Sequence, residues 1–165
     1  MKKTLLLLVG LSACTAPTYA PGTVSQLDFV PWMGSGPATL TGQAFLTTRG
    51  GDVRTCAGNE VQLYPANQFD MKLLNAFSRG DKIIDYAPQM AAITQANIRT
   101  TVCDAGGNFE FDNIPAGPWL LKTEVRWDAG TQDQVFPQGG YLIRGISLKP
   151  GTTKIIMDVR NLVGQ

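Results

Sequence analysis

Asp104, Asn108 and Asp112 follow one another at intervals of four residues, and their side-chain oxygens are the kind of ligand that calcium takes. The spacing differs from that of an EF-hand loop. Asp and Asn are also common in turns, because their side chains accept bonds from nearby backbone N–H groups. We therefore expect turn residues here and predict no metal site.

The 165-residue chain contains no histidine. This excludes Ser–His and Cys–His nucleophilic sites, histidine-ligated zinc and imidazole acid–base chemistry. The sequence also lacks the G-x-G-x-x-G, P-loop and G-x-S-x-G patterns, so we predict no enzyme activity and no cofactor. With 14 Lys and Arg against 13 Asp and Glu, net charge gives no basic face for nucleic acid.

Trp127 follows an amphipathic segment and is the aromatic residue best suited to stack on a sugar ring, since an indole presents an apolar face. The same alternation puts Trp127 in register with Trp119 and Val125, as expected of a core residue, and the periodicity favours the core. On the opposite face, Lys122, Glu124 and Arg126 have the pattern of a solvated, salt-bridged surface.

The N-terminus has the layout of an exported lipoprotein. Lys2 and Lys3 precede an apolar run too short to span a bilayer. Leu11-Ser12-Ala13-Cys14 resembles the bacterial lipobox, so we predict a signal peptide over residues 1–13 and a lipid on Cys14. The alternative is an ordinary signal peptide cut after a small residue such as Ala20. By resemblance to enterobacterial lipoproteins, Thr15 favours the periplasmic face of the outer membrane over inner-membrane retention.

If Cys14 carries a lipid, Cys56 and Cys103 remain as a pair in an oxidising compartment. An even pair in that setting indicates one disulfide. A redox or metal-binding pair is the alternative, but the C-x-x-C spacing is missing and so is any further soft ligand.

Between residues 38 and 162 the chain indicates one mainly β domain. Apolar and polar residues alternate with period two, which predicts strands, and glycine pairs at Gly50-Gly51, Gly106-Gly107 and Gly139-Gly140 predict turns between them. About seven short strands separated by turns favour an antiparallel β-sandwich. The segments with this alternation are 38–47, 60–64, the surroundings of Phe109 and Phe111, 119–127, 141–148 and a last strand with Ile155, Met157 and Val159 on one face.

Two segments depart from this pattern. Residues 67–96 form an insertion in which Phe69, Leu73 and Phe77 recur at helical spacing, which predicts short helices. Residues 14–37 are rich in Pro, Gly, Ser and Thr, as expected of a tether, but include an apolar cluster from Phe29 to Met33. Each segment either covers the core or contacts a partner. The candidate partner residues are Trp32, Ile83, Tyr86 and Met90.

Residues 104–119, Asp-Ala-Gly-Gly-Asn-Phe-Glu-Phe-Asp-Asn-Ile-Pro-Ala-Gly-Pro-Trp, resemble the signature of carboxypeptidase regulatory-like domains. Those domains are transthyretin-like (prealbumin-like) β-sandwiches. The pattern is an acidic residue, a glycine turn, an aromatic-x-aromatic strand and an Ile-Pro-Ala-Gly turn before an aromatic residue. The resemblance implies a transthyretin-like fold over about residues 38–160 and says little about chemistry. Transthyretin-related hydrolases and intradiol dioxygenases depend on histidines that this chain lacks.

Together these features predict a non-enzymatic, lipid-anchored envelope protein that acts as a structural or protein-interaction module. Its partners would be the membrane, through the lipid, and an unidentified envelope protein. One alternative is a glycan-binding module, since related sandwiches include starch-binding-like domains. Another is an accessory outer-membrane lipoprotein of a secretion machine, by analogy with the transthyretin-like lipoprotein of type VI secretion.

Overall fold

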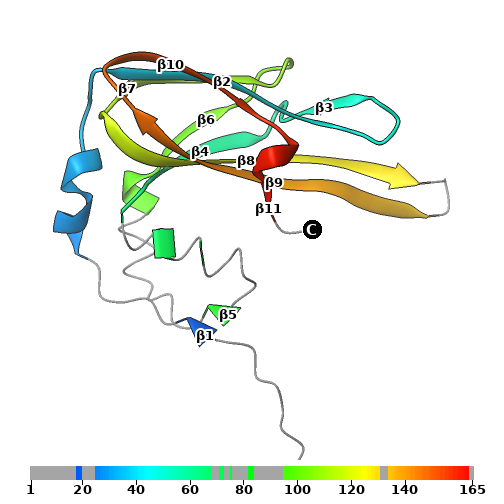
Figure 1. The fold of residues 1–165 in the computed structure, drawn as a ribbon, viewed down its shortest axis with the longest axis horizontal. Helices are drawn as coiled ribbons and strands as arrows, with labels where there is room; N and C mark the ends of the chain where they lie inside the picture. The colour runs from blue at the N-terminus through cyan, green and yellow to red at the C-terminus, as the bar shows by residue number, and fades with distance from the viewer. Residues whose placement is uncertain are drawn as a thin grey trace, which may run out of the picture.

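Two β-sheets pack face to face and enclose the core (Figure 1). The computed structural model describes residues 18–19, 25–67, 71–72, 75, 82–83, 95–130 and 134–163. The mainly β sandwich expected from the sequence is therefore confirmed. Over the same residues, no helix has the length and apolar character needed to cross a membrane.

The first sheet is built around β2 (Ala38–Thr47). On one side β2 pairs in parallel with β10 (Gly151–Met157). On the other side it pairs antiparallel with β7 (Asn108–Ile114) and, further along, with β3 (Val53–Thr55). The β2–β10 pair departs from the purely antiparallel sandwich that we expected.

The second sheet is antiparallel, in the order β11-β9-β8-β4-β6. Its centre is a long hairpin of β8 (Gly117–Gly130) and β9 (Val135–Leu148), paired over the full length of both strands. The remaining strands are β4 (Glu60–Pro65), β6 (Arg99–Val102) and β11 (Leu162–Val163). The hairpin runs past the core at one end, where the β2–β3 hairpin also lies (Figure 1).

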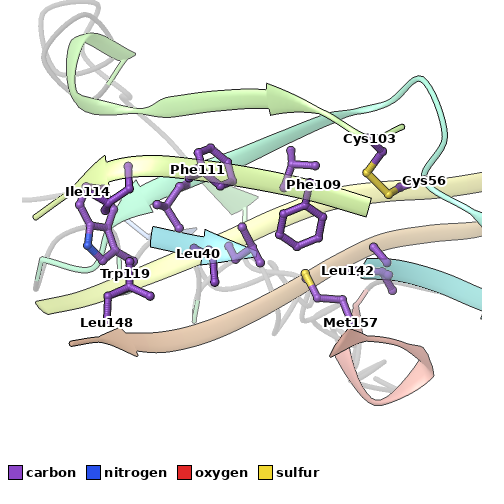
Figure 2. Close-up of a cluster of buried hydrophobic side chains, with 14 of the residues drawn as sticks. Leu40, Cys56, Cys103, Phe109, Phe111, Ile114, Trp119, Leu142, Leu148 and Met157 are labelled. Carbon is purple, nitrogen blue, oxygen red and sulfur yellow. A yellow bond between two sulfur atoms is a disulfide. The ribbon is translucent and has the colours of Figure 1, made fainter. Parts of the chain in front are cut away.

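Alternating apolar residues from both sheets form the core, because successive side chains in a strand point to opposite faces. Phe109 and Phe111 of β7 are 4% and 5% exposed, and Trp119 of β8 is fully buried. Trp119 also donates from its indole nitrogen to the Pro115 carbonyl at 2.9 Å. Figure 2 shows these side chains packed between the sheets with Leu40, Ile114, Leu142, Leu148 and Met157.

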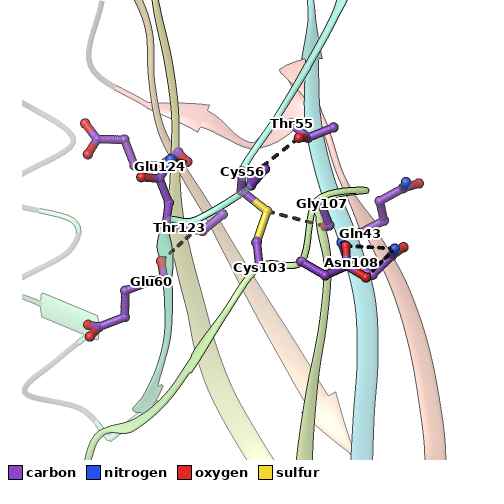
Figure 3. The surroundings of a disulfide bond; sticks show 12 residues. Gln43, Thr55, Cys56, Glu60, Cys103, Gly107, Asn108, Thr123 and Glu124 are labelled. Carbon is purple, nitrogen blue, oxygen red and sulfur yellow. Dashed lines mark hydrogen bonds between the residues drawn. A yellow bond between two sulfur atoms is a disulfide. The ribbon is translucent and has the colours of Figure 1, made fainter.

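The disulfide predicted from the cysteine count is confirmed between Cys56 and Cys103, with Cα atoms 5.8 Å apart (Figure 3). Cys56 follows β3, where the chain crosses from the first sheet to β4 of the second. Cys103 follows β6, where the chain crosses back to β7. The bond therefore ties the two crossovers together. Closing a loop of 47 residues contributes about 4 kcal/mol in the chain-entropy account.

The apolar cluster before the sandwich forms a 3-10 helix, η1 (Gln26–Trp32). Phe29 is fully buried, Trp32 is 8% exposed, and the Trp32 indole donates to the Pro118 carbonyl at 2.6 Å. Phe29 and Trp32 therefore dock on the domain, the arrangement that the sequence favoured for this cluster, and the Trp32 ring leaves little surface for a partner. The exposed apolar side chains of this segment are Leu27, Val30 and Met33.

Two further expectations from the sequence are wrong. Gly139-Gly140 makes no turn but lies inside β9, opposite Arg126 and Val125, and β9 begins at Val135. Val159 does not continue the inner face of the last strand. It lies in a short 3-10 helix, η2 (Val159–Asn161), and is 67% exposed.

Most of the 67–96 insertion lies outside the described residues, including Tyr86 and Met90. The backbone is helical at Met71, Lys72, Asn75 and residues 95–97. Within the insertion, β5 (Lys82–Ile83) pairs in parallel with β1 (Thr18–Tyr19).

Candidate functional site

A cleft of about 390 Å³ lies at the end of the sandwich where the two hairpins extend past the core. Its walls come from segments far apart in the sequence, and it opens between the two sheets. The β2 end and its turn contribute one wall and the β8–β9 hairpin the opposite wall, while η2 and β11 contribute the rest. The lining residues are Leu46, Thr47, Thr48, Arg49, Gly50, Trp127, Ala129, Gln138, Gly139, Val159 and Leu162.

Trp127 is the aromatic side chain of this cleft. Trp127 is partly buried and packs against the core, as the periodicity indicated. The same indole lines the cleft, so the stacking position considered from the sequence is also available. Trp127 therefore contacts both the core and the cleft, and its packing on the core restricts the orientation of the indole.

Gly139 allows the indole to lie against β9. A Cβ atom built on Gly139 would come within 3.0 Å of Trp127 Cζ3 and would overlap the carbonyl oxygen of Val125. Gly139 also has φ +87°, a conformation that L side chains rarely adopt. A glycine that appeared to be a turn residue therefore makes room for the aromatic wall of the cleft.

The inner face of the extended hairpin continues beyond Trp127. Trp127 is opposite Gln138 in the ladder, and the next inner pair is Ala129 with Phe136. Gln138 provides an amide beside the indole. Phe136 is 55% exposed and lies diagonally from Trp127, where aromatic side chains are within reach of each other.

The facing wall carries Thr48 and Arg49 beside Leu46, and its turn is held by hydrogen bonds. Thr48 N–H donates to the Asp52 carbonyl at 2.8 Å, and Asp52 N–H donates to Thr48 Oγ1 at 3.0 Å. Gly51 N–H donates to the Thr48 carbonyl at 3.0 Å, with Gly51 at φ +94°. The turn that presents Arg49 is therefore closed by three bonds.

A larger open depression of about 840 Å³ lies along β10, β2 and β7. Its aromatic lining residue, Phe109, is 4% exposed and so offers almost no ring surface. Two of its cations are engaged: Arg144 donates to the Ile156 carbonyl at 2.8 Å, and Arg160 is paired with Asp158 at 2.7 Å. The smaller cleft has the better combination of aromatic and polar groups.

Asp104, Asn108 and Asp112 do not converge on one point. Asp104 Oδ1 accepts from the backbone N–H groups of Gly106 and Asn108, each at 2.8 Å, and both its oxygens accept from Asn108 Nδ2 at 3.0 Å. Asp112 Oδ1 instead accepts from Thr39 Oγ1 at 3.0 Å. These residues fasten the chain, as the turn interpretation predicted. In the described part of the chain, no three His, Cys, Asp or Glu side chains gather as metal ligands.

A second aromatic position lies on the outer face of the five-stranded sheet. The Tyr141 ring has Lys122 Nζ at 4.6 Å and Arg126 Cζ at 5.5 Å from its centre, and Arg126 also pairs with Glu124. This confirms the salt-bridged surface expected for these charges. Because two cations occupy the surroundings of its ring, Tyr141 is a less open stacking surface than Trp127.

The remaining residues singled out from the sequence are not brought into this cleft. Cys14, Tyr86 and Met90 lie outside the described residues, and of Ile83 the structure gives the backbone alone, paired with Tyr19. Arg49 and Gln138 line the cleft but were not among the sequence candidates. The alternation of β9, carried back past Gly140, could have found Gln138.

No family model matches the chain, and neither does any curated protein. Among solved structures, the chain is similar to a protein of Pseudomonas aeruginosa described as a putative carbohydrate binding protein. The TM-score is 0.68 at 20% sequence identity, over 84% of this chain and 99% of the other. At that identity the similarity establishes a shared fold.

Proposed function

We propose that this protein is a non-enzymatic glycan-binding module, with the cleft between the β2–β3 and β8–β9 hairpins as its site. The observation that carries the proposal is the placement of Trp127 in a cleft whose opposite wall carries Thr48 and Arg49. A sugar ring has apolar C–H faces and a rim of hydroxyl groups. It therefore needs an aromatic surface beneath and hydrogen-bonding side chains around the edge.

The residues around Trp127 fit this requirement. Gln138 offers both a donor and an acceptor, and Thr48 and Arg49 line the same cleft from the other hairpin. The cleft volume of about 390 Å³ lies within the usual range of small-ligand sites. The shared fold with a protein described as a putative carbohydrate binding protein supports the same function.

The same proposal includes attachment to the cell envelope, which the lipobox-like N-terminal sequence supports. Cys14 would carry the lipid, and residues 15–24 would join it to η1. The strands and turns of residues 104–119 support membership of the carboxypeptidase regulatory-like, transthyretin-like group. Asp104 and Gly107 form the turn, Phe109 and Phe111 fill the core, and Trp119 closes it.

The test is glycan binding by Trp127→Ala. We expect a loss of about tenfold or more in affinity, or of retention on an immobilised glycan, since aromatic stacking supplies much of the contact. Tyr141→Ala is the matched control, because Tyr141 is an aromatic strand residue on the outer face of the same sheet. Tyr141→Ala should bind like the wild type.

Trp127 also packs on the core, so a loss of folding must be separated from a loss of binding. Trp127→Phe keeps an aromatic ring and should retain part of the affinity, while Gln138→Ala removes the amide without altering the core. Melting temperatures of all variants are measured alongside. If well-folded Trp127→Ala and Gln138→Ala bind glycans as the wild type does, the site lies elsewhere.

A further inference from the structure

Arg49 is the charged residue of the cleft: among its described lining residues the others are apolar or uncharged, and no acidic side chain takes part. A cation in a partly enclosed site, without a nearby anion to neutralise it, favours a negatively charged ligand. The position of Arg49 therefore bears on which glycans the cleft accepts.

The carboxylate closest to Arg49 in the sequence is that of Asp52. Asp52 lies 3.9 Å from the Arg54 guanidinium, and its backbone closes the Thr48 turn. Among the described residues, no carboxylate forms an ion pair with Arg49. Its guanidinium therefore has donors to offer a ligand.

The turn fixes where Arg49 is presented. On one side of Arg49, the backbone N–H, the carbonyl and the hydroxyl of Thr48 all form hydrogen bonds within the turn. On the other side, Gly50 lines the cleft. Since the Thr48–Asp52 turn is closed by hydrogen bonds, less conformational freedom is lost when a ligand binds to it. Trp127 and Gln138 line the same cleft from the β8–β9 hairpin.

We propose that the cleft selects acidic glycans, with Arg49 binding the carboxylate of a uronic acid while Trp127 stacks on its ring. A guanidinium presents a planar fork of N–H donors that matches the two oxygens of a carboxylate. This inference rests on the proposed glycan-binding function and adds the ligand class to it.

The test uses the full-length chain and oligosaccharides of galacturonic, glucuronic and mannuronic acid, each beside its methyl ester. The ester keeps the sugar ring and removes the charge. We expect at least one acid to bind about tenfold or more tightly than its ester, since a charge-assisted bond is worth more than a neutral one. Rising salt should reduce this difference, because an exposed ion pair is screened.

Three variants assign the effect to Arg49. Arg49→Gln should bring the acid down to the affinity of its ester, and Arg49→Lys should retain only part of the preference, since it keeps the charge without the fork. Arg54→Gln is the matched control: it removes an arginine of the same hairpin that does not line the cleft and should leave the preference intact.

The outcomes separate this inference from the proposed function. Equal binding of acids and esters, abolished by Trp127→Ala, overturns the acidic preference and leaves a glycan site. If the preference for acids survives Arg49→Gln but is lost in Arg54→Gln, the carboxylate is bound outside the cleft, and the proposed role of Arg49 is overturned. Binding of acids that is unaffected by Trp127→Ala is charge attraction without a sugar site and overturns both proposals, as does a failure to bind any of the probes.

Discussion

At the scale of single residues, the cleft depends on a glycine as much as on its tryptophan. Because Gly139 has no side chain, the Trp127 ring can lie close to its backbone. The φ of Gly139, +87°, is a conformation that glycine adopts easily. A side chain at this position would push on the Val125 carbonyl, on Trp127, or on both. The orientation of the indole is therefore set from the neighbouring strand.

We expect Gly139→Ala to lower the free energy of unfolding by about 1–3 kcal/mol, from the positive φ and the overlap with Val125. It should also shift the tryptophan fluorescence and weaken glycan binding. Gly145→Ala is the matched control in the same strand, since a Cβ there meets only Leu120 Cδ2 at 3.9 Å. Denaturant titration of both variants measures the difference. If Gly139→Ala is as stable as Gly145→Ala, the glycine does not position the indole.

Residue types alone could identify Trp127 but not the rest of the site. Trp127 could be identified because an indole is largely apolar, so it can pack in the core and can also stack on a ligand. Arg49 precedes a glycine pair and so had the appearance of an ordinary surface turn residue. Its proposed role depends on Trp127 and Gln138, which are far along the chain but line the same cleft. The local sequence pattern around Arg49 cannot indicate that these residues lie in one cleft.

At the scale of elements, the Asp104 carboxylate stabilises the turn between β6 and β7 by accepting several hydrogen bonds. The hydrogen bond from the Asn108 side chain, and then those from the backbone of Asn108, Gly106 and Gly107, hold the pKa of Asp104 below its ordinary value of 3.8. The folded turn therefore favours the ionised carboxylate. Its stabilising contribution is fully present above about pH 4 and is lost as the pH falls through the lowered pKa.

We expect Asp104→Asn to destabilise the protein most at neutral pH, with the difference from wild type shrinking as the pH falls through the lowered pKa of Asp104 and the wild-type carboxyl is protonated. Urea denaturation over a pH series measures this. In an Asn108→Ala background the dependence on pH should be weaker, because the largest cause of the shift is then missing. A stability difference that stays constant from neutral to acidic pH would contradict the assignment.

Elements with regular alternation could be predicted closely from the sequence, and those without it could not. β2 occupies the range expected, Ala38–Thr47, because its apolar residues alternate cleanly. β6 was missed because it is a sheet-edge strand, Arg-Thr-Thr-Val, with no buried residue to create a pattern. Gly139-Gly140 was predicted to be a turn but lies within a strand. A glycine pair in the sequence looks the same whether glycine is needed for a turn or for a close approach of neighbouring atoms.

At the scale of the whole molecule, the cleft and η1 lie at opposite ends of the sandwich. The cleft lies at the end where the β8–β9 hairpin extends, while η1 lies at the other end of the sandwich (Figure 1). A chain attached through its N-terminus would therefore hold the η1 end toward its attachment and the cleft away from it. This arrangement suits a module that meets glycans at a distance from the membrane.

We expect Cys14→Ser either to release the domain from membranes or to leave an unprocessed precursor, because the lipid would have no attachment atom. Membrane fractionation and the mass of the mature N-terminus measure this. Thr15→Asp should remain membrane-bound and, by the enterobacterial rule, shift toward the inner membrane. If Cys14→Ser fractionates and is processed like the wild type, the lipobox interpretation is wrong.

The parallel pair of β2 and β10 has a consequence for mechanical load. The two strands run side by side from Gly151 opposite Ala38 to Met157 opposite Ala44, one near each end of the described chain. Tension applied to the start of β2 and the end of β10 would pull the strands in opposite directions along their own axes. The hydrogen bonds between them would then be loaded in shear, all together rather than one after another as in unzipping. A domain pulled at both ends would first have to release η1 from the core and β11 from β9, and the β2–β10 pair would then resist further extension.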